Sequence, residues 1–296
     1  MSMKKKHAVL ICSVVAILCL LAGLFFLLFH FGVFDSLGLG PGGKNSVRVP
    51  ILMYHHFADE GEPGTIISSA TFESQLKALS DAGYSAISFD ELCAYVSDGV
   101  DLPDRPVIIT IDDGYGSVYE TAFPLLKKYN MKATVFIIGV SHGKSVYKDT
   151  NYLIIPRFSD AEALEMSESG FMSVQTHSYD MHQHEPYETG PFRTGVLQMD
   201  GESRDEYIAA FTADFERAAS QLEDIVGIRP FVFSYPFGKH SELSEKLLRD
   251  LGVKVTLTID TGVNTVVRNS PNCLYKLKRF NVPGDMSPER LLEMIG

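Results

Sequence analysis

The stretch Pro106–Gly114, which reads PVIITIDDG, determines the fold class of this chain. Its first six residues are proline followed by apolar and β-branched residues, as in a strand that is covered on both faces. Two adjacent aspartates and a glycine then end the strand. Because like charges raise each other's pKa, adjacent aspartates at a buried strand end are costly unless a cation compensates one of them. The stretch therefore predicts a buried parallel strand with a polar site at its carboxyl end.

The same alternation extends in both directions along the chain. Further apolar runs that predict strands lie at residues 49–57, 85–89, 132–138, 171–177, 231–234, 253–259 and 275–280. Predicted helices separate them, with starts at Thr71, Asp90, Asp160, Ser203 and Ser241. Strands that alternate with helices imply parallel βαβ units, and the number of units favours an α/β barrel over an open sheet.

Charge and motifs exclude two classes of partner. The 296 residues carry a formal net charge of −11, so the protein is repelled by phosphate backbones, and nucleic-acid binding is not expected. A neutral or cationic substrate suits such a charge better than an anionic polymer. No G-x-G-x-x-G or Walker-type sequence follows any predicted strand, so no nucleotide cofactor is expected.

The N-terminus is predicted to be a membrane anchor. Residues 1–7 form a basic tail, residues 8–34 a transmembrane segment, residues 35–46 a Gly-rich linker and residues 47–296 the outer domain. The uncharged apolar part of the segment is long enough to cross a bilayer as a helix, which needs roughly 20 residues. The preceding lysines favour a cytoplasmic N-terminus by the positive-inside rule, which places the outer domain outside the cell.

Two other interpretations of this segment are open. A cleaved signal peptide would have a shorter apolar region, of about 7–15 residues, and a small-x-small cleavage site, which we do not find. A buried core helix is the second alternative, and the Gly-rich break that follows disfavours it. The cysteines are sparse and do not form a disulfide framework. Cys93 and Cys273 could pair only if the fold brings them together, and we expect them to be free and mostly buried.

Candidate functional groups fall at the ends of four predicted strands. His55 and His56 end one of them, the two aspartates Asp112 and Asp113 end another, His177 ends a third, and the turn SYPFG follows a fourth. In parallel α/β folds, sites form outside the carboxyl ends of the strands. The side chains are therefore predicted to converge. Asp-Asp-Gly alone is also compatible with an ordinary turn in which an aspartate caps the next helix.

His177 and His182 are the candidate metal ligands downstream. A separation of five places them apart on a helix and on opposite faces of a strand, so they converge only if residues 178–181 form a loop. Two imidazoles and one carboxylate form a common ligand set for catalytic zinc. The alternatives are a solvated His-rich loop and a different ligand, His184.

TIDDG, HSYDMH and SYPFG, in this order, resemble the motifs of the polysaccharide deacetylase family, which has the NodB homology domain and is carbohydrate esterase family 4. With the upstream VPILMYHHF, the resemblance covers nearly all of residues 47–296, with the core motifs from about residue 106. It implies a distorted (β/α) barrel. It also implies a metal-dependent hydrolase that removes N-acetyl groups from an extracellular or cell-wall polysaccharide containing N-acetylglucosamine.

The resemblance assigns roles to individual residues. It implies Asp112 as the general base, and Asp113, His177 and His182 as ligands of a divalent metal, by default zinc, for which cobalt or nickel could substitute. Histidines five apart resemble the subgroup that deacetylates poly-N-acetylglucosamine, and that subgroup implies His55 as general acid. His56 is the neighbouring alternative. The turn formed by Tyr235, Pro236 and Phe237 is expected to present a backbone N–H to the oxyanion.

One departure from the family pattern concerns an arginine. Many members have Arg-x-Pro-Tyr where this chain has Ser234-Tyr235-Pro236-Phe237, and the missing arginine would orient the base. Arg279, at the end of the last predicted strand, is the proposed replacement by position alone, and a surface arginine is the alternative. Three rival functions remain: an O-acetyl esterase acting on xylan or peptidoglycan, a catalytically inert carbohydrate-binding relative, and a metal-dependent phosphoesterase, which would need more ligands for a second metal.

Overall fold

The computed structural model describes residues 45–61 and 64–296. The predicted tail, the predicted membrane anchor and most of the predicted linker lie outside these residues. No helix within the described ranges is long and apolar enough to span a bilayer. The chain divides into two compact units at Val47, and the unit Arg48–Gly296 contains every element that positions the site.

The described residues form short strands and mostly short helices. The strands are β1 (Ser46–Val49), β2 (Ile51–Tyr54), β3 (His56–Phe57), β4 (Ile66–Ile67), β5 (Ser85–Ala86), β6 (Pro106–Ile111), β7 (Ala133–Ile137), β8 (Met172–Thr176), β9 (Val232–Ser234), β10 (Val255–Leu257), β11 (Asn264–Val267) and β12 (Phe280–Asn281). The helices are α3 (Ser69–Asp81), α4 (Phe89–Ser97), α5 (Phe123–Lys128), α6 (Asp160–Glu168), α7 (Arg204–Val226), α8 (Glu242–Asp250) and α9 (Pro288–Ile295), with shorter turns η1 (Val118–Ala122), η2 (Gly139–Ser141), η3 (Pro236–Gly238) and η4 (Pro271–Leu274).

One parallel sheet organises the unit. Its strands follow the order β10-β9-β8-β7-β6-β2-β12, and β5 pairs with β6 in addition. Every ladder of this sheet is parallel, as the alternation of strands and helices predicts. All six residues of β6 are buried, which agrees with its apolar sequence. Because the strands are parallel, the residues that follow β2, β6, β8 and β9 emerge at one edge of the sheet.

The predicted barrel is only partly realised. The sheet is curled and its end strands β10 and β12 share no ladder among the described residues. A single parallel bridge, between Leu257 and Leu277, links the segment that leads into β12 to the end of β10. Three residues later, Phe280 pairs with Leu52 of β2. The segment from Leu277 to Phe280 therefore spans the gap between the two edges, and Arg279 lies within it.

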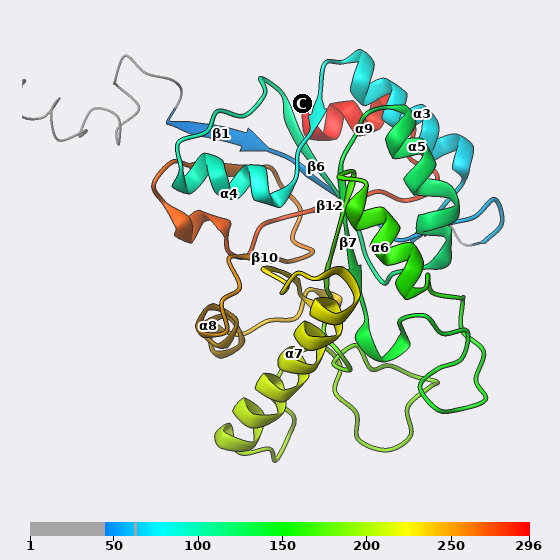
Figure 1. The fold of residues 1–296 in the computed structure, drawn as a ribbon, viewed down its shortest axis with the longest axis vertical. Helices are drawn as coiled ribbons and strands as arrows, with labels where there is room; N and C mark the ends of the chain where they lie inside the picture. The colour runs from blue at the N-terminus through cyan, green and yellow to red at the C-terminus, as the bar shows by residue number, and fades with distance from the viewer. Residues whose placement is uncertain (1–44, 62–63) are drawn as a thin grey trace, which may run out of the picture. The chain divides into compact units, whose positions relative to one another are not determined.

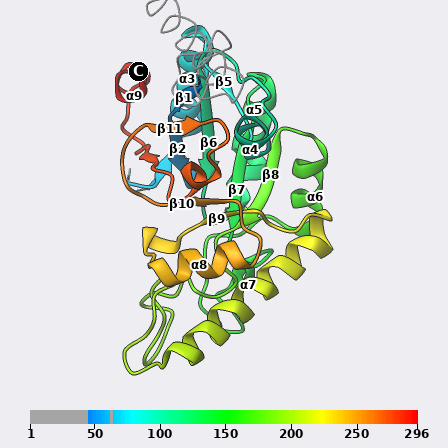
Figure 2. The same cartoon turned by 90° about the vertical axis from the view of Figure 1, so that its left-hand side faces the viewer.

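Helices cover the sheet on both sides. Figure 1 shows α3, α5 and α6 on one side of the central strands, and α4 and α8 on the other. The turned view in Figure 2 shows the long helix α7 running past β8 and β9 below the sheet. One apolar cluster joins β2, β6, β7 and β8 to α3 and α9, and another joins β9 to α7 and α8.

The helix starts were predicted with mixed accuracy. Ser203 and Ser241 cap α7 and α8, as expected. The first two starts were wrong, because Ser68 and Ser88 are the N-caps of α3 and α4. Each of these serines accepts a hydrogen bond from a backbone N–H three residues ahead, which satisfies one of the free donors of the helix end. Cys93 and Cys273 are free, as expected, but only half-buried.

Candidate active site

The two adjacent aspartates after β6 leave the strand in different directions. Asp112 continues the sheet, since its N–H donates to the Tyr54 carbonyl over 2.9 Å. Asp113 has a φ of 72° and so turns the chain, and Gly114 follows with a φ of 69°. A Cβ at Gly114 would lie 3.0 Å from Ile137 Cγ2, so a side chain there is opposed by both backbone and packing. This turn separates the two carboxylates into different surroundings.

The carboxylate of Asp112 is held by Arg279. Arg279 Nη1 and Nη2 donate to Asp112 Oδ1 and Oδ2, each over 2.8 Å, in a bidentate pair with both side chains buried. The other donors of the guanidinium reach Thr258 O at 2.9 Å, Ser234 Oγ at 2.9 Å and Thr110 Oγ1 at 3.2 Å. All five N–H groups of the arginine are thus bonded to the protein. The surface alternative for Arg279 is wrong.

A neighbouring charge determines whether Asp112 is ionised. Burial alone would raise the pKa of this carboxyl. The Arg279 guanidinium beside it nevertheless holds its pKa below the usual range. Asp112 therefore remains an anion at neutral pH although it is buried. Arg279 occupies the position relative to this aspartate that the missing motif arginine was expected to fill.

Asp113 faces two imidazoles instead of an arginine. His182 Nε2 lies 3.7 Å from Asp113 Oδ1, and His177 Nε2 lies 3.8 Å from the same oxygen. One potential ligand atom from each of the three residues lies within 4.8 Å of the others. Asp113 Oδ1 is buried and has no hydrogen-bond partner among the described residues. A buried carboxylate oxygen without a partner, opposite two ring nitrogens, fits a divalent metal ion.

The orientation of His177 is fixed by its other ring nitrogen. His177 Nδ1 lies 2.7 Å from the Ser234 carbonyl oxygen, which only accepts, so Nδ1 carries the proton. Nε2, the other ring nitrogen, faces Asp113 and is the atom that a metal would use. Burial lowers the pKa of His182 to about 4, so that imidazole is neutral at pH 7 and also has a lone pair available. Both rings therefore present a nitrogen toward Asp113.

The loop between the two histidines is held by Asp214, a half-buried aspartate on α7. Asp214 Oδ2 and Oδ1 accept the N–H groups of Tyr179 and Asp180 over 2.9 and 2.7 Å. Ser178 has a φ of 83°, and its Oγ accepts the Met181 N–H over 3.1 Å. Residues 178–181 thus form the loop that the spacing of five requires. The rival ligand His184 lies outside the cluster of potential ligands, with its Nδ1 2.7 Å from the Glu185 carbonyl oxygen.

The two candidate general acids differ in their bonding. His56 Nδ1 lies 2.8 Å from Ser117 Oγ, and its ring packs 4.9 Å from that of Tyr115. His55 follows β2 directly, and its buried Nδ1 has no partner among the described residues. His55 is also close enough to Asp112 and Asp113 to interact electrostatically with both. His55 is therefore the histidine of this pair that remains unbound beside the two carboxylates.

The SYPFG turn contributes less than expected. The Tyr235 N–H donates to the Leu257 carbonyl over 3.0 Å, and the buried Tyr235 hydroxyl donates to Glu245 Oε2 over 2.7 Å. Pro236 has no N–H, so neither residue can offer a donor to the site. Phe237, with a φ of 56°, turns its ring against His182 at 4.1 Å between centroids. Of the three residues, Phe237 alone keeps the predicted place beside the site.

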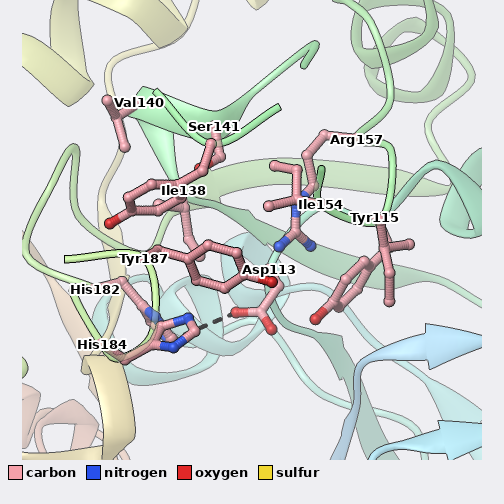
Figure 3. Close-up of a pocket in the computed structure, with 12 residues that line it drawn as sticks. Asp113, Tyr115, Ile138, Val140, Ser141, Ile154, Arg157, His182, His184 and Tyr187 are labelled. Atoms are coloured by element: carbon pink, nitrogen blue, oxygen red, sulfur yellow. Dashed lines mark ion pairs between the residues drawn. The ribbon is translucent and has the colours of Figure 1, made fainter. Parts of the chain in front are cut away.

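A cavity of about 130 Å³ opens beside Asp113. Its walls combine aromatic, apolar and charged side chains: Tyr115, Ile138, Tyr147, Ile154, Arg157, His182, His184 and Tyr187 among them. Figure 3 shows Asp113, His182, Arg157 and Tyr115 arranged around the space, and the dashed line joins Asp113 to His182. The sequence analysis missed Tyr115, Arg157 and Asp214. Only Tyr115 had a signal, since it follows the Asp-Asp-Gly turn directly.

Comparisons with known proteins agree with this geometry. A family model described as polysaccharide deacetylase matches residues 99–256, which include both aspartates, both histidines and the SYPFG turn. YxkH of Bacillus subtilis (strain 168), which is named after the same family, is 25% identical over 244 residues, or 82% of this chain and 75% of that protein. A poly-beta-1,6-N-acetyl-D-glucosamine N-deacetylase of Staphylococcus aureus (strain MRSA252) is 35% identical over 116 residues, which is 39% of this chain and 38% of that relative.

Solved structures share the fold. IcaB from Ammonifex degensii aligns with a TM-score of 0.68 at 25% identity, covering 84% of this chain and 97% of that one. The Streptococcus pyogenes deacetylase PplD, in complex with acetate, aligns with a TM-score of 0.65 at 23% identity and covers 84% and 99% of the two chains. The second likeness concerns the fold alone.

Proposed function

Because the chain belongs to the polysaccharide deacetylase family, we propose that it is a metal-dependent hydrolase that removes N-acetyl groups from an N-acetylglucosamine polymer outside the cell. One observation carries the proposal: the unpartnered Asp113 Oδ1 lies opposite His177 and His182, beside an Asp112 that Arg279 keeps ionised. This pairing of a cation site with a buried anionic base suits hydrolysis of an unreactive amide. It also argues against an inert carbohydrate-binding relative.

Asp113, His177 and His182 would hold the metal. When bound there, a divalent metal supplies Lewis acidity toward the acetyl oxygen and toward water. Zinc is our first choice for two imidazoles and one carboxylate, and cobalt or nickel suits the same ligands. The Ser234 carbonyl and Asp214 keep the ligands in place, the first through the ring of His177 and the second through the loop before His182.

The remaining side chains would move the protons. Asp112 would take a proton from the attacking water, since it is ionised, buried and 3.9 Å from His177 Nε2. Arg279 and Ser234 orient it without neutralising it by proton transfer, because an arginine stays protonated in proteins. His55 would protonate the departing amine. Within the SYPFG turn, the Phe237 N–H would be the group that donates to the oxyanion.

The substrate and the cellular location are part of this proposal. The staphylococcal relative, named for poly-beta-1,6-N-acetyl-D-glucosamine, supports a glucosamine polymer over xylan. The apolar segment at residues 8–34 supports a single-pass anchor with the catalytic domain outside. Protease treatment of intact cells would test this location, since an outside domain is degraded and an inside domain is protected.

Acetate release tests the activity. The purified protein should release acetate from poly-N-acetylglucosamine and from chito-oligomers, lose the activity with a chelator and regain it with added zinc. Peptidoglycan and acetylxylan in the same panel distinguish N-acetyl from O-acetyl hydrolysis. Release from acetylxylan only would replace the amidase assignment by an esterase. Absence of release from every polymer after zinc is added would refute the proposal.

A further inference from the structure

Arg157 lies in the wall of the cavity, and two of its hydrogen-bond donors are not used by the described part of the protein. Its Nε and Nη1 are buried and have no hydrogen-bond partner among the described residues. The guanidinium carbon lies 3.8 Å from the centre of the Tyr115 ring. In Figure 3 the guanidinium points into the space between Asp113 and Tyr115. Buried donors without partners are rare in folded proteins and call for an explanation.

The position of Arg157 is fixed by the turn that carries the aspartates. Arg157 and Tyr115 form an antiparallel bridge, and the Gly116 N–H donates to the Pro156 carbonyl over 2.8 Å. On the far side, the Phe158 N–H donates to the Gly114 carbonyl over 3.3 Å. The segment around Arg157 is thus tied to the residues that follow Asp113. Its guanidinium is held ready for a ligand, without a rearrangement of the backbone.

A comparison with Arg279 shows what Arg157 lacks. Every N–H of Arg279 is bonded to the protein, and its charge is matched by Asp112. No ion pair joins Arg157 to a carboxylate in the described part of the chain, although its charge helps to lower the pKa of Asp113. The Nε and Nη1 donors of Arg157 are therefore free to bond to acceptors on a ligand.

The cavity indicates which acceptors these are. Aromatic and apolar side chains, including Tyr147, Ile154 and Tyr187, form much of its wall and suit the face of a sugar ring. The net charge of −11 disfavours a polyanionic polymer, so the acceptors are hydroxyl oxygens of a neutral sugar and not carboxylates.

We propose that Arg157 is a substrate-binding residue that selects the sugar unit to be deacetylated, by donating hydrogen bonds from its buried Nε and Nη1 to hydroxyl oxygens of the N-acetylated sugar. The inference rests on the proposed function, because the acetyl group of that sugar is placed at Asp113. Arg157 contributes equally to binding of the ground state and of the transition state. Its removal should therefore raise KM and leave kcat nearly unchanged.

Steady-state kinetics on an N-acetylglucosamine trimer tests the role. Arg157→Gln should raise KM about ten- to a hundredfold, the range for hydrogen bonds from a charged donor, and change kcat less than about threefold. Arg157→Lys should recover part of the loss, and the affinity for zinc should be unchanged in both variants. Arg105→Gln is the matched control, because Arg105 also stacks on a tyrosine, at 4.2 Å from the Tyr84 ring centre, but bonds the Ala82 carbonyl away from the site.

A binding measurement separates this inference from the proposed function. Calorimetric titration of the trimer into Asp112→Asn needs no turnover, and adding Arg157→Gln to that background should raise Kd by the same factor. An unchanged KM and Kd in Arg157→Gln would overturn the role of Arg157. A higher inhibition constant for acetate with an unchanged KM would also overturn it, since the arginine would then bind the product. Failure of the wild type to release acetate from any polymer refutes the proposed function instead.

Discussion

Asp112 and Asp113 are neighbours in the sequence, yet the protein treats their charges in opposite ways. Asp112 lies against Arg279, which matches both carboxylate oxygens with hydrogen bonds of 2.8 Å. Asp113 lies against two imidazoles and keeps one buried oxygen without a partner among the described residues. The first charge is compensated by the chain itself, and the second is left for a cation that the chain does not supply. This difference supports the proposal that Asp112 is the base and Asp113 a metal ligand.

Removal of the ligand carboxylate should have the largest effect. We expect Asp113→Ala to lose its metal, and turnover to fall by at least about a thousandfold, because the metal contributes several kcal/mol to the transition state. Metal content by plasma mass spectrometry and acetate release measure the two losses. His184→Ala should keep its metal, since His184 lies outside the ligand cluster. Full metal content in Asp113→Ala would remove the distinction between the two aspartates.

The base should be separable from the metal. We expect Asp112→Asn to retain the metal and to lose about 10²- to 10⁴-fold in kcat, the usual contribution of a general base. The measurement is acetate release at saturating chito-oligomer with metal content determined on the same sample. Normal deacetylation by this variant would show that another group takes the proton.

Removal of Arg279 should leave the buried negative charge of Asp112 uncompensated. Arg279→Met leaves a buried carboxylate without its cation, so the free energy of unfolding should fall by about 3–5 kcal/mol, as measured by urea unfolding. Replacing both partners, with Asp112→Leu and Arg279→Met together, should recover much of this loss. A double variant that is no more stable than Arg279→Met would show that the ion pair itself is not what Arg279 contributes.

The same variant should change the pH dependence. Arg279 holds the pKa of Asp112 below its usual range, so the wild-type base stays ionised as the pH falls. In Arg279→Met the largest opposition to burial is lost and that pKa should rise, so the acid limb of the pH–rate profile should move to higher pH. The lowered pKa also stabilises the native state above the unfolded-state pKa of about 4, and this stability is lost as the pH falls further. Superimposable profiles would contradict the assignment.

The smallest effect is expected at Asp214, behind the metal loop. An asparagine offers one oxygen to the two N–H groups that Asp214 now accepts, so the loop before His182 should loosen. We expect Asp214→Asn to lower the affinity for zinc about 10- to 100-fold, as for other residues that support metal ligands. Competition with a chromophoric chelator measures this. Asp224→Asn, at an exposed position of α7, is the control and should bind zinc as the wild type does.

The sequence predicted what depends on local pattern. The buried strand β6, the alternation into a parallel sheet and the loop between His177 and His182 all follow from apolar periodicity and spacing. Asp112 and Arg279 are separated by 167 positions, and their contact was expected only from the position of the arginine at a strand end. Such a contact depends on how the sheet curls, which no local pattern encodes.

Three features could not be predicted, for physical reasons. Arg157 comes from an irregular segment, and backbone contacts with residues 114–116 bring it to the cavity. Asp214 lies on the helix α7, and an aspartate on a helix normally faces solvent. Its contact with the loop 178–181 depends on how α7 packs beside that loop. A backbone N–H of the SYPFG turn was expected to face the site, but the Tyr235 N–H donates to the Leu257 carbonyl instead. In each case the partner is chosen by tertiary packing.

The segment from Leu277 to Phe280, which spans the gap between the sheet edges, has a consequence for the order of folding. The chain is synthesised from its N-terminus, so Asp112 exists long before the arginine that compensates it, 167 positions later. Contacts between such distant positions close large loops and form slowly. Until this segment docks, the Asp112 carboxylate has no arginine to compensate its charge. Docking of the segment therefore compensates Asp112 and bridges the two edges of the sheet together, and a chain without this segment would lack both.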